Sequence, residues 1–182
     1  MERLSTAELE AGLDEVRASP VDAGSLELVV RRPTTGEREV LAQGELHLDE
    51  GLVGDNWRRR GSRFTEDGSA HPDMQLNVMN ARVIALVARR AERWQLAGDQ
   101  LYVDLDLSAD NLPAGTRLSL GTAVIEVTDR PHTGCAKFSQ RFGVDALRFV
   151  NSPVGRQLRL RGINAKVVRA GVVRPGDVVT KA

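Results

Sequence analysis

Short runs of alternating apolar and polar residues, separated by turn residues, limit the fold of this chain more than any other feature. In the clearest run, residues 101–107, leucine and valine at the odd positions alternate with tyrosine and aspartate. This two-residue period predicts a strand with one buried and one solvent-facing side. Further strands are predicted at residues 26–32, 37–48, 73–79, 116–120, 122–128, 162–169 and 178–180. Many short strands joined by turns favour a barrel or sandwich over a βαβ sheet.

Helical spacing appears in only a few segments. Ser5 and Glu8 form the pattern of a capping box before an apolar stripe that ends at Pro20. Asn80 is placed to cap a helix that reaches Trp94, and residues 143–150 predict a short helix. The expected fold class is therefore mainly β (α+β), with a helical appendage at residues 1–24 and a β domain at residues 25–182.

Composition excludes several function classes. Lys plus Arg and Asp plus Glu each number 25, so no overall field draws the chain to nucleic acid or an acidic membrane. The first residues lack the apolar core of a secretory signal, and no stretch reaches the roughly 20 apolar residues that span a bilayer. A single cysteine rules out an internal disulfide, and a reducing, cytoplasmic location is expected.

That cysteine, Cys135, lies in the most informative segment, Asp129 to Phe138, directly after a predicted strand. A thiolate is a strong nucleophile and a soft metal ligand, and nearby cations would favour it. The cations close in sequence are Arg130, His132, Lys137 and Arg141. His132 is the candidate base, and Gly134 would let backbone N–H groups approach a ligand.

Ordinary alternatives remain at each of these positions. A lone cysteine is often a small buried apolar residue, and a histidine three residues earlier could simply cap a turn. A cysteine hydrolase would need a base and an orienting residue in fixed geometry, and a zinc site would need a recognised ligand spacing. The sequence contains neither a protease signature nor such a spacing around Cys135.

Two arginine-rich segments could hold an anion. The stretch between Gly51 and Pro72 contains Arg58, Arg59, Arg60 and Arg63, which suit a phosphate or oxyanion, or else form a solvated loop. In residues 156–165, Arg159 and Arg161 would share one face if the segment were extended. A turn at Gly162 could instead place Arg161 beside the cysteine loop.

Taken in order, these motifs resemble a MOSC domain, the module found at the C-terminus of molybdenum cofactor sulfurases and in stand-alone bacterial proteins. They span about residues 51–177: Gly51-Leu52-Val53-Gly54-Asp55, the segment 114–121, the Cys135 loop, Arg161-Gly162-Ile163, and Gly171 leading to Pro175-Gly176-Asp177. The resemblance implies a β-barrel and a cysteine that carries sulfur or ligates the metal of a molybdopterin cofactor. It also implies cationic side chains that bind the cofactor, for which the candidates are Arg58, Arg60, Arg130, Lys137, Arg141 and Arg161.

This chain also departs from the family pattern. Many relatives have a histidine soon after the Gly-Asp pair, where this sequence has Asn56 and Trp57. The pyridoxal-phosphate desulfurase domain of the sulfurases is missing, so pyridoxal phosphate is not expected and sulfur carriage would need a donor protein. The leading hypothesis is a molybdopterin-binding enzyme, acting with a redox partner on N-hydroxylated substrates, or a sulfur carrier. The alternatives are a non-catalytic cofactor- or anion-binding module and a structural domain with a buried Cys135.

Overall fold

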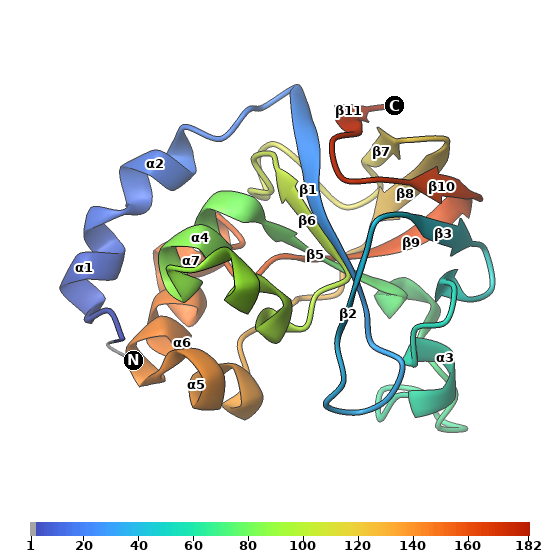
Figure 1. Cartoon of the computed structure of the whole chain (residues 1–182), viewed down its shortest axis with the longest axis horizontal. Coiled ribbons are helices and arrows are strands. Elements are labelled where there is room, and N and C mark those ends of the chain that lie inside the picture. Colours follow the sequence, from blue (N-terminus) through green and yellow to red (C-terminus); the bar gives the residue numbers. More distant parts are fainter. Residues whose placement is uncertain (1–2) are drawn as a thin grey trace.

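The computed structural model describes residues 3–182 and contains a closed seven-stranded β-barrel (Figure 1). Strands follow one another in the order β11-β7-β8-β9-β5-β6-β1, and β11 also pairs with β1, which closes the sheet. Among the strands of residues 3–182, β5 and β6 alone pair in parallel. The bounds are β1 (Ala23–Arg31), β5 (Leu76–Asn80), β6 (Leu101–Asp104), β7 (Arg117–Leu120), β8 (Ala123–Val127), β9 (Ile163–Arg169) and β11 (Val178–Lys181). The predicted mainly-β (α+β) barrel is confirmed.

The predicted strand 37–48 is two strands in different sheets. The first part, β2 (Glu39–Leu41), forms the expected hairpin with β1 across the Pro33–Gly36 turn. The second part, β3 (Gly44–His47), pairs with β4 (Gly51–Leu52) and β10 (Gly171–Val173). Gly44 permits this change of sheet, because a β-carbon there would lie 2.8 Å from the Leu52 side chain.

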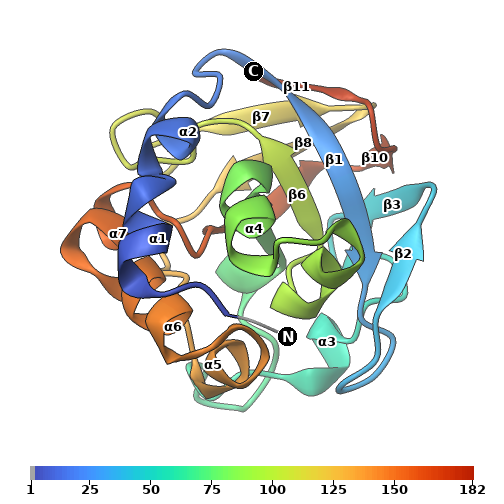
Figure 2. The ribbon, with the colours of Figure 1, turned by 60° about the vertical axis from the view of Figure 1, so that its left-hand side comes forward.

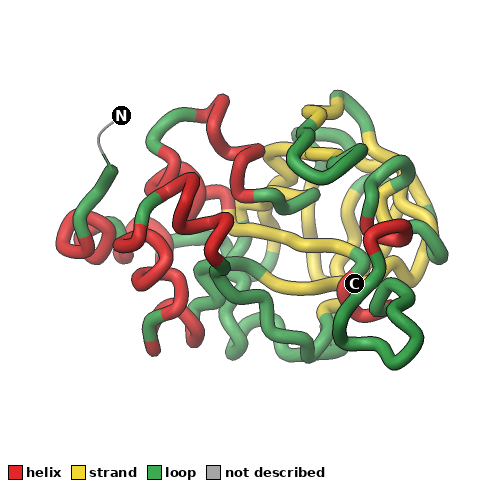
Figure 3. The backbone as a smooth tube through the Cα atoms, turned by 90° about the horizontal axis from the view of Figure 1, so that it is seen from below, coloured by secondary structure: helices red, strands yellow, loops and turns green. Residues whose placement is uncertain are grey.

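Most of the short helices gather on one side of the barrel (Figure 3), whereas α3 lies near β3 on the other side (Figure 1). The helices are α1 (Thr6–Ala11), α2 (Leu13–Arg17), α3 (Trp57–Arg60), α4 (Ala81–Ala88), α5 (Ala136–Phe142), α6 (Val144–Asn151) and α7 (Pro153–Gln157), with 3₁₀ helices η1 (Pro72–Met74) and η2 (Ala91–Ala97). Asn80 caps α4 as predicted, but that helix ends at Arg89 in a left-handed conformation (φ 62°) and η2 continues the chain. None of the helices within residues 3–182 has the length and apolar character needed to cross a bilayer.

Two apolar cores divide the molecule, one inside the barrel and one between the barrel and the helices. Tyr102 was expected on a solvent-facing side, and this expectation is wrong. Its side chain is fully buried in the second core, under α4 and η2, and its hydroxyl donates to the Trp94 carbonyl at 2.8 Å. A barrel strand covered by helices is buried on both sides, so strict alternation of polarity does not imply a wet face here.

The N-terminal helices pack into this second core. The Ser5–Glu8 capping box is present, and Leu9, Leu13 and Val16 are buried. Figure 2 shows α1 beside α6 and α2 beside α4. Gly12 separates α1 from α2 because a β-carbon there would lie 2.6 Å from the Leu86 side chain. The predicted amphipathic helix is thus confirmed, with a break at its centre.

Candidate functional site

A basic cleft of about 430 Å³ opens beside the cysteine loop. It lies between the β1–β2 hairpin loop, the end of η2 and α5. No Asp or Glu of residues 3–182 lines this main cleft. Seven basic side chains line it: Arg32, Arg38, Arg60, His132, Lys137, Arg141 and Arg161. Cys135 also lines it, and its side chain is exposed. The alternative that Cys135 is a buried core residue is therefore wrong.

The loop that carries Cys135 is fixed at both ends by asparagine side chains. Asn151 of α6 accepts a hydrogen bond from the Gly134 N–H at 2.9 Å and donates to the Gly134 carbonyl at 3.1 Å. Asn164 of β9 donates to the Arg130 and Pro131 carbonyls. The N–H of Gly134 itself is therefore occupied, and the expected approach of other backbone N–H groups to a ligand stays a prediction. The role of Gly134 is close packing, since a β-carbon would lie 2.7 Å from the Leu147 side chain.

Asp99 organises the base of the main cleft. This fully buried carboxylate accepts two hydrogen bonds from Arg161 Nη1, at 2.8 and 2.7 Å, and lies 2.8 Å from His132 Nε2. Burial alone would raise the pKa of Asp99, but Arg161 and His132 together hold it at about 2. Asp99 is therefore an anion that fixes the positions of both cleft residues.

The same triad sets the protonation of His132. Burial lowers the pKa of His132, the Arg161 charge lowers it further, and the opposing effect of Asp99 is smaller. The imidazole is then neutral at physiological pH. Because ionised Asp99 can only accept, His132 carries its proton on Nε2, which leaves Nδ1 as an unprotonated acceptor.

A second buried ion pair also lies at the main cleft. Arg32 donates to both oxygens of Asp55, at 2.9 and 2.8 Å, and both side chains are buried. Asp55 also accepts from the Trp57 N–H at 2.9 Å, which positions the start of α3. The Gly54-Asp55 motif thus anchors an arginine of the cleft, and its own carboxylate stays beneath the surface.

Four arginines converge on the end of η2. Its successive carbonyls each accept one guanidinium hydrogen bond: Gln95 from Arg38 (3.1 Å), Leu96 from Arg141 (2.6 Å), Ala97 from Arg161 (3.0 Å) and Gly98 from Arg32 (3.0 Å). We call these four side chains the arginine comb. The carbonyl end of a helix carries partial negative charge, which accounts for their assembly from three separate segments: the β1–β2 loop, α5 and the turn before β9.

Positive charge in the main cleft exceeds what the buried carboxylates neutralise. Asp55 and Asp99 pair with Arg32 and Arg161, whereas Arg38, Arg60, Lys137 and Arg141 form no ion pair within residues 3–182. Burial, reinforced by Arg141 and Arg32, lowers the pKa of Arg38, and burial and Arg32 lower that of Arg60. These cations destabilise one another, so a bound anion would be favoured.

Two buried polar atoms of cleft residues, Asn56 Oδ1 and Arg161 Nε, have no hydrogen-bond partner among the described residues. Asn56 lines the cleft, is 8% exposed, and its Oδ1 makes no hydrogen bond. Buried polar atoms are nearly always satisfied, so an unpaired one at a cleft indicates a place for a ligand donor.

Six of the predicted site residues line the main cleft: Arg60, His132, Cys135, Lys137, Arg141 and Arg161. Arg58 is exposed on α3 outside it, and Arg130 lines a different pocket with Arg156 and Arg159. The extended interpretation of residues 156–165 is wrong, because the chain turns through Arg159 (φ 49°) and β9 begins only at Ile163. The alternative turn, which places Arg161 beside the cysteine loop, is confirmed.

Sequence reasoning missed Arg32, Arg38, Asn56 and Asp99, all of which build the main cleft or its base. Arg32 and Arg38 flank a predicted hairpin turn, and Asp99 follows a helix-ending glycine. Those positions carry no motif, and only the closed barrel brings them together. Within residues 3–182 no group of three His, Cys, Asp or Glu side chains could hold a metal ion.

Comparisons with known proteins agree with this architecture. No curated protein matches the sequence. Among solved structures, YuaD of Bacillus subtilis is similar with a TM-score of 0.64 and 16% identity, over 86% of this chain and 94% of that one. YiiM of Escherichia coli is similar with a TM-score of 0.56 and 19% identity, over 87% of this chain and 69% of that one. At such identities the likeness establishes the fold alone.

The sequence itself supplies the family. The family profile described as the MOSC domain matches residues 65–180, which include most of the barrel strands, the cysteine loop and α5. The resemblance predicted from the motifs is thereby confirmed. The chain belongs to the MOSC-domain family, whose module is like the C-terminal domain of molybdenum cofactor sulfurases.

Proposed function

We propose that the main cleft binds an anionic pterin cofactor of the molybdopterin type, with Cys135 as a ligand of its metal. The observation that carries this proposal is an exposed thiol opening onto a cleft lined by seven basic side chains and no carboxylate of residues 3–182. A soft thiolate suits molybdenum, and a surplus of cations suits the phosphate of such a cofactor.

The residues present fit this group. Arg38, Arg60, Lys137 and Arg141 line the cleft without carboxylate partners in the described chain, so they are available to a phosphate. The unpaired Asn56 Oδ1 offers an acceptor to a pterin N–H. The arginine comb is held by backbone carbonyls, so its geometry is set before any ligand binds.

Each cleft residue then has a defined task. When bound, the cofactor would supply the redox chemistry, and the protein supplies position and electrostatics. Cys135 fixes the metal end, while Arg38 and Arg141 orient the phosphate end. His132, held by Asp99, can accept a proton at Nδ1. Reduction of an N-hydroxylated substrate, with electrons from a redox protein, is the reaction to test first.

A second candidate is a protein that carries sulfur as a persulfide on Cys135, or that holds the cofactor without catalysis. The exposure of Cys135, and its position as the single cysteine of the chain, favour this candidate. A sulfur-donor protein would then act as its partner.

Metal and pterin analysis tests the first candidate. Wild-type protein, Cys135→Ser and the matched control Ser139→Ala, on the same helical segment, should be purified without oxygen. Molybdenum and pterin fluorescence are expected in wild type and Ser139→Ala, with molybdenum reduced in Cys135→Ser. Equal molybdenum in all three would remove the thiol from the ligand role. Absence of both from all three would favour sulfur carriage, detectable as an added sulfur by mass spectrometry.

Alkylation tests the environment of the thiol independently of any cofactor. A basic cleft should attract an anionic reagent, so iodoacetate should gain on neutral iodoacetamide relative to a free thiol in solution. The preference should shrink in Lys137→Gln, which removes a nearby positive charge and leaves the single cysteine in place. Slow labelling of the native protein by both reagents would contradict an accessible, reactive Cys135.

A further inference from the structure

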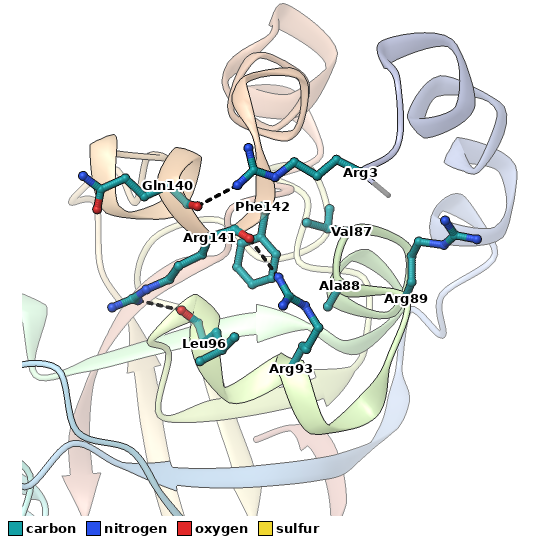
Figure 4. Close-up of a pocket in the computed structure, with 9 residues that line it drawn as sticks. All are labelled: Arg3, Val87, Ala88, Arg89, Arg93, Leu96, Gln140, Arg141 and Phe142. Atoms are coloured by element: carbon teal, nitrogen blue, oxygen red, sulfur yellow. Dashed lines mark hydrogen bonds between the residues drawn. The ribbon is translucent and has the colours of Figure 1, made fainter. Parts of the chain in front are cut away.

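A second pocket, of about 360 Å³, lies behind α5 (Figure 4). It is enclosed by the end of α4, by η2, by α5 and by the segment that contains Arg3. Apolar side chains, including Leu96 and Phe142, form part of its wall, and Gln140 separates it from the main cleft. A volume of this size lies at the lower end of the range for small-molecule sites.

Arginines from separate segments surround this pocket, and no Asp or Glu of residues 3–182 lines it. Arg3, Arg89 and Arg93 form no ion pair among the described residues. Glu8 is near enough to Arg89 to interact electrostatically, and its carboxylate also accepts hydrogen bonds from the N–H and hydroxyl of Ser5. Glu8 therefore offsets part of the Arg89 charge, and the surplus positive charge of the pocket rests mainly on Arg3 and Arg93.

Ordinary helix capping accounts for only part of this arrangement. Arg3 and Arg93 each donate from one nitrogen to a carbonyl in the last turn of α5, to Gln140 at 2.9 Å and Arg141 at 2.8 Å. Cations are favourable at such an end. A guanidinium has five N–H donors, however, so most of the donors of both residues remain available.

Arg93 supplies a second, independent observation. Its Nε is buried and has no hydrogen-bond partner, although its guanidinium lies 5.7 Å from the centroid of the Phe142 ring. A buried guanidinium nitrogen without an acceptor is unfavourable, and an anion in the pocket would supply one after a small side-chain movement.

The pocket is a neighbour of the main cleft and is distinct from it. Arg141 lines both, but its guanidinium is turned to the Leu96 carbonyl, away from Arg93, as Figure 4 shows. The carbonyl of Arg141, by contrast, faces Arg93. Neither Cys135 nor His132 belongs to this second pocket.

We propose that this pocket is a second anion-binding site that takes the phosphate of a phosphorylated small molecule. Arg3 and Arg93 hold the phosphate, Arg89 adds charge at the rim, and the Phe142 and Leu96 side chains contact the less polar part of the ligand. Occupancy does not depend on a cofactor in the main cleft, so this site stands or falls separately from the proposed function.

Isothermal titration with inorganic pyrophosphate tests the site on the full chain. Each arginine should contribute a charge-assisted contact, so Arg93→Gln and Arg3→Gln should each weaken one binding event by about 10-fold to 100-fold. Arg93→Lys, which keeps the charge, should retain part of the affinity. Arg60→Gln, which changes the main cleft and lies outside this pocket, should leave this event unchanged, as should the exposed Arg58→Gln. Thermal unfolding of each variant verifies that the fold is retained.

Two results would overturn the proposal. If folded Arg93→Gln and Arg3→Gln bind pyrophosphate as wild type does, the pocket is no anion site. If Arg60→Gln abolishes all binding, the main cleft alone takes the anion. Adenosine monophosphate, tested in the same way, should bind more tightly than inorganic phosphate if the apolar wall contributes, and equal affinities would limit the site to the phosphate group.

Discussion

Two groups of arginines in this protein look similar in charge and differ in what holds them. Arg58, Arg59, Arg60 and Arg63 follow closely along the chain, yet only Arg60 lines the main cleft. The arginine comb comes from residues 32, 38, 141 and 161, and all four of its members line the cleft. A cluster of arginines in the sequence therefore did not predict which arginines cluster in the folded protein.

The difference lies in the acceptors that each group finds. Each member of the comb binds one of four successive carbonyls at the end of η2, and two members also bind buried carboxylates. In the other group, Arg59 reaches the Pro33 carbonyl and Arg63 lies over the Phe64 ring, both at exposed positions. The arginines form a binding site where fixed acceptors hold their side chains in place, and the number of arginines alone does not determine this.

The largest effect should follow from removing the carboxylate that fixes one member of the comb, Arg161. Asp99→Asn leaves Arg161 buried without its counter-ion, and such a change typically destabilises by about 3–5 kcal/mol. Urea unfolding, followed by circular dichroism, measures the difference. Asp145→Asn, which removes an exposed pair with Arg148 at 3.7 Å, is the matched control and should change stability by less than about 1 kcal/mol. Equal losses in both variants would show that the buried anchor is no stronger than a surface pair.

A smaller effect is expected on ligand binding when an uncompensated member of the comb is removed. Arg38→Gln should weaken pyrophosphate binding in the main cleft by about 10-fold to 100-fold, since a charge-assisted contact is lost. Burial and neighbouring cations already lower the pKa of Arg38, so its removal relieves repulsion and stability should hardly fall. Titrating Arg38→Gln in an Arg93→Gln background isolates the main cleft. Arg63→Gln is the control and should bind pyrophosphate as wild type does. An equal loss of affinity in Arg63→Gln and Arg38→Gln would contradict the difference between the two groups of arginines.

The fold followed from local signals because turns and alternation are local properties. The Ser5–Glu8 capping box, the Pro33–Gly36 hairpin and the strand at residues 163–169 all lie where the pattern placed them. The errors have tertiary causes. Tyr102 is buried because helices cover that side of β6, and the predicted strand 37–48 divides because β3 finds β10, more than 100 residues later in the chain.

The site was predictable only in part, for the same reason. Cys135, His132 and Lys137 share one short loop and helix, so proximity in sequence was enough to group them. Asp99 and Arg38 became site residues through barrel closure and through the carbonyls of η2, and neither leaves a mark in the surrounding sequence. The prediction for Arg58 failed in the opposite way: the sequence pattern made it a cofactor-binding candidate, but its position on α3 exposes it to solvent outside the main cleft.

The pH dependence of stability should show that His132 differs from a histidine in free solution. Burial and Arg161 lower the pKa of His132, with Asp99 opposing and Arg32 adding to the fall. As the pH drops below about 6.5, the unfolded chain takes up a proton that the folded chain resists, so stability falls by at most about 1.4 kcal/mol per pH unit. His132→Gln can still donate a hydrogen bond to Asp99 but cannot take up this proton. Its stability should therefore lack the part of the pH dependence that His132 causes, measured in unfolding curves between roughly pH 5 and pH 7, the range in which histidine titrates. An identical pH dependence in both proteins would contradict a depressed pKa.

The smallest effect, and the sharpest test of the comparison, concerns two arginines of one helix. Arg58 and Arg60 both belong to α3, but only Arg60 lines the main cleft, and burial lowers its pKa. Arg58→Gln should change the free energy of unfolding by no more than about 0.5 kcal/mol and leave anion binding unchanged. Arg60→Gln removes the same charge from the same helix and should weaken pyrophosphate binding in the main cleft. Both substitutions change the net charge by the same amount, so long-range electrostatics alone predicts the same loss of pyrophosphate affinity in each. Equal losses would mean that the cleft binds anions through its overall field and not through direct contacts of Arg60.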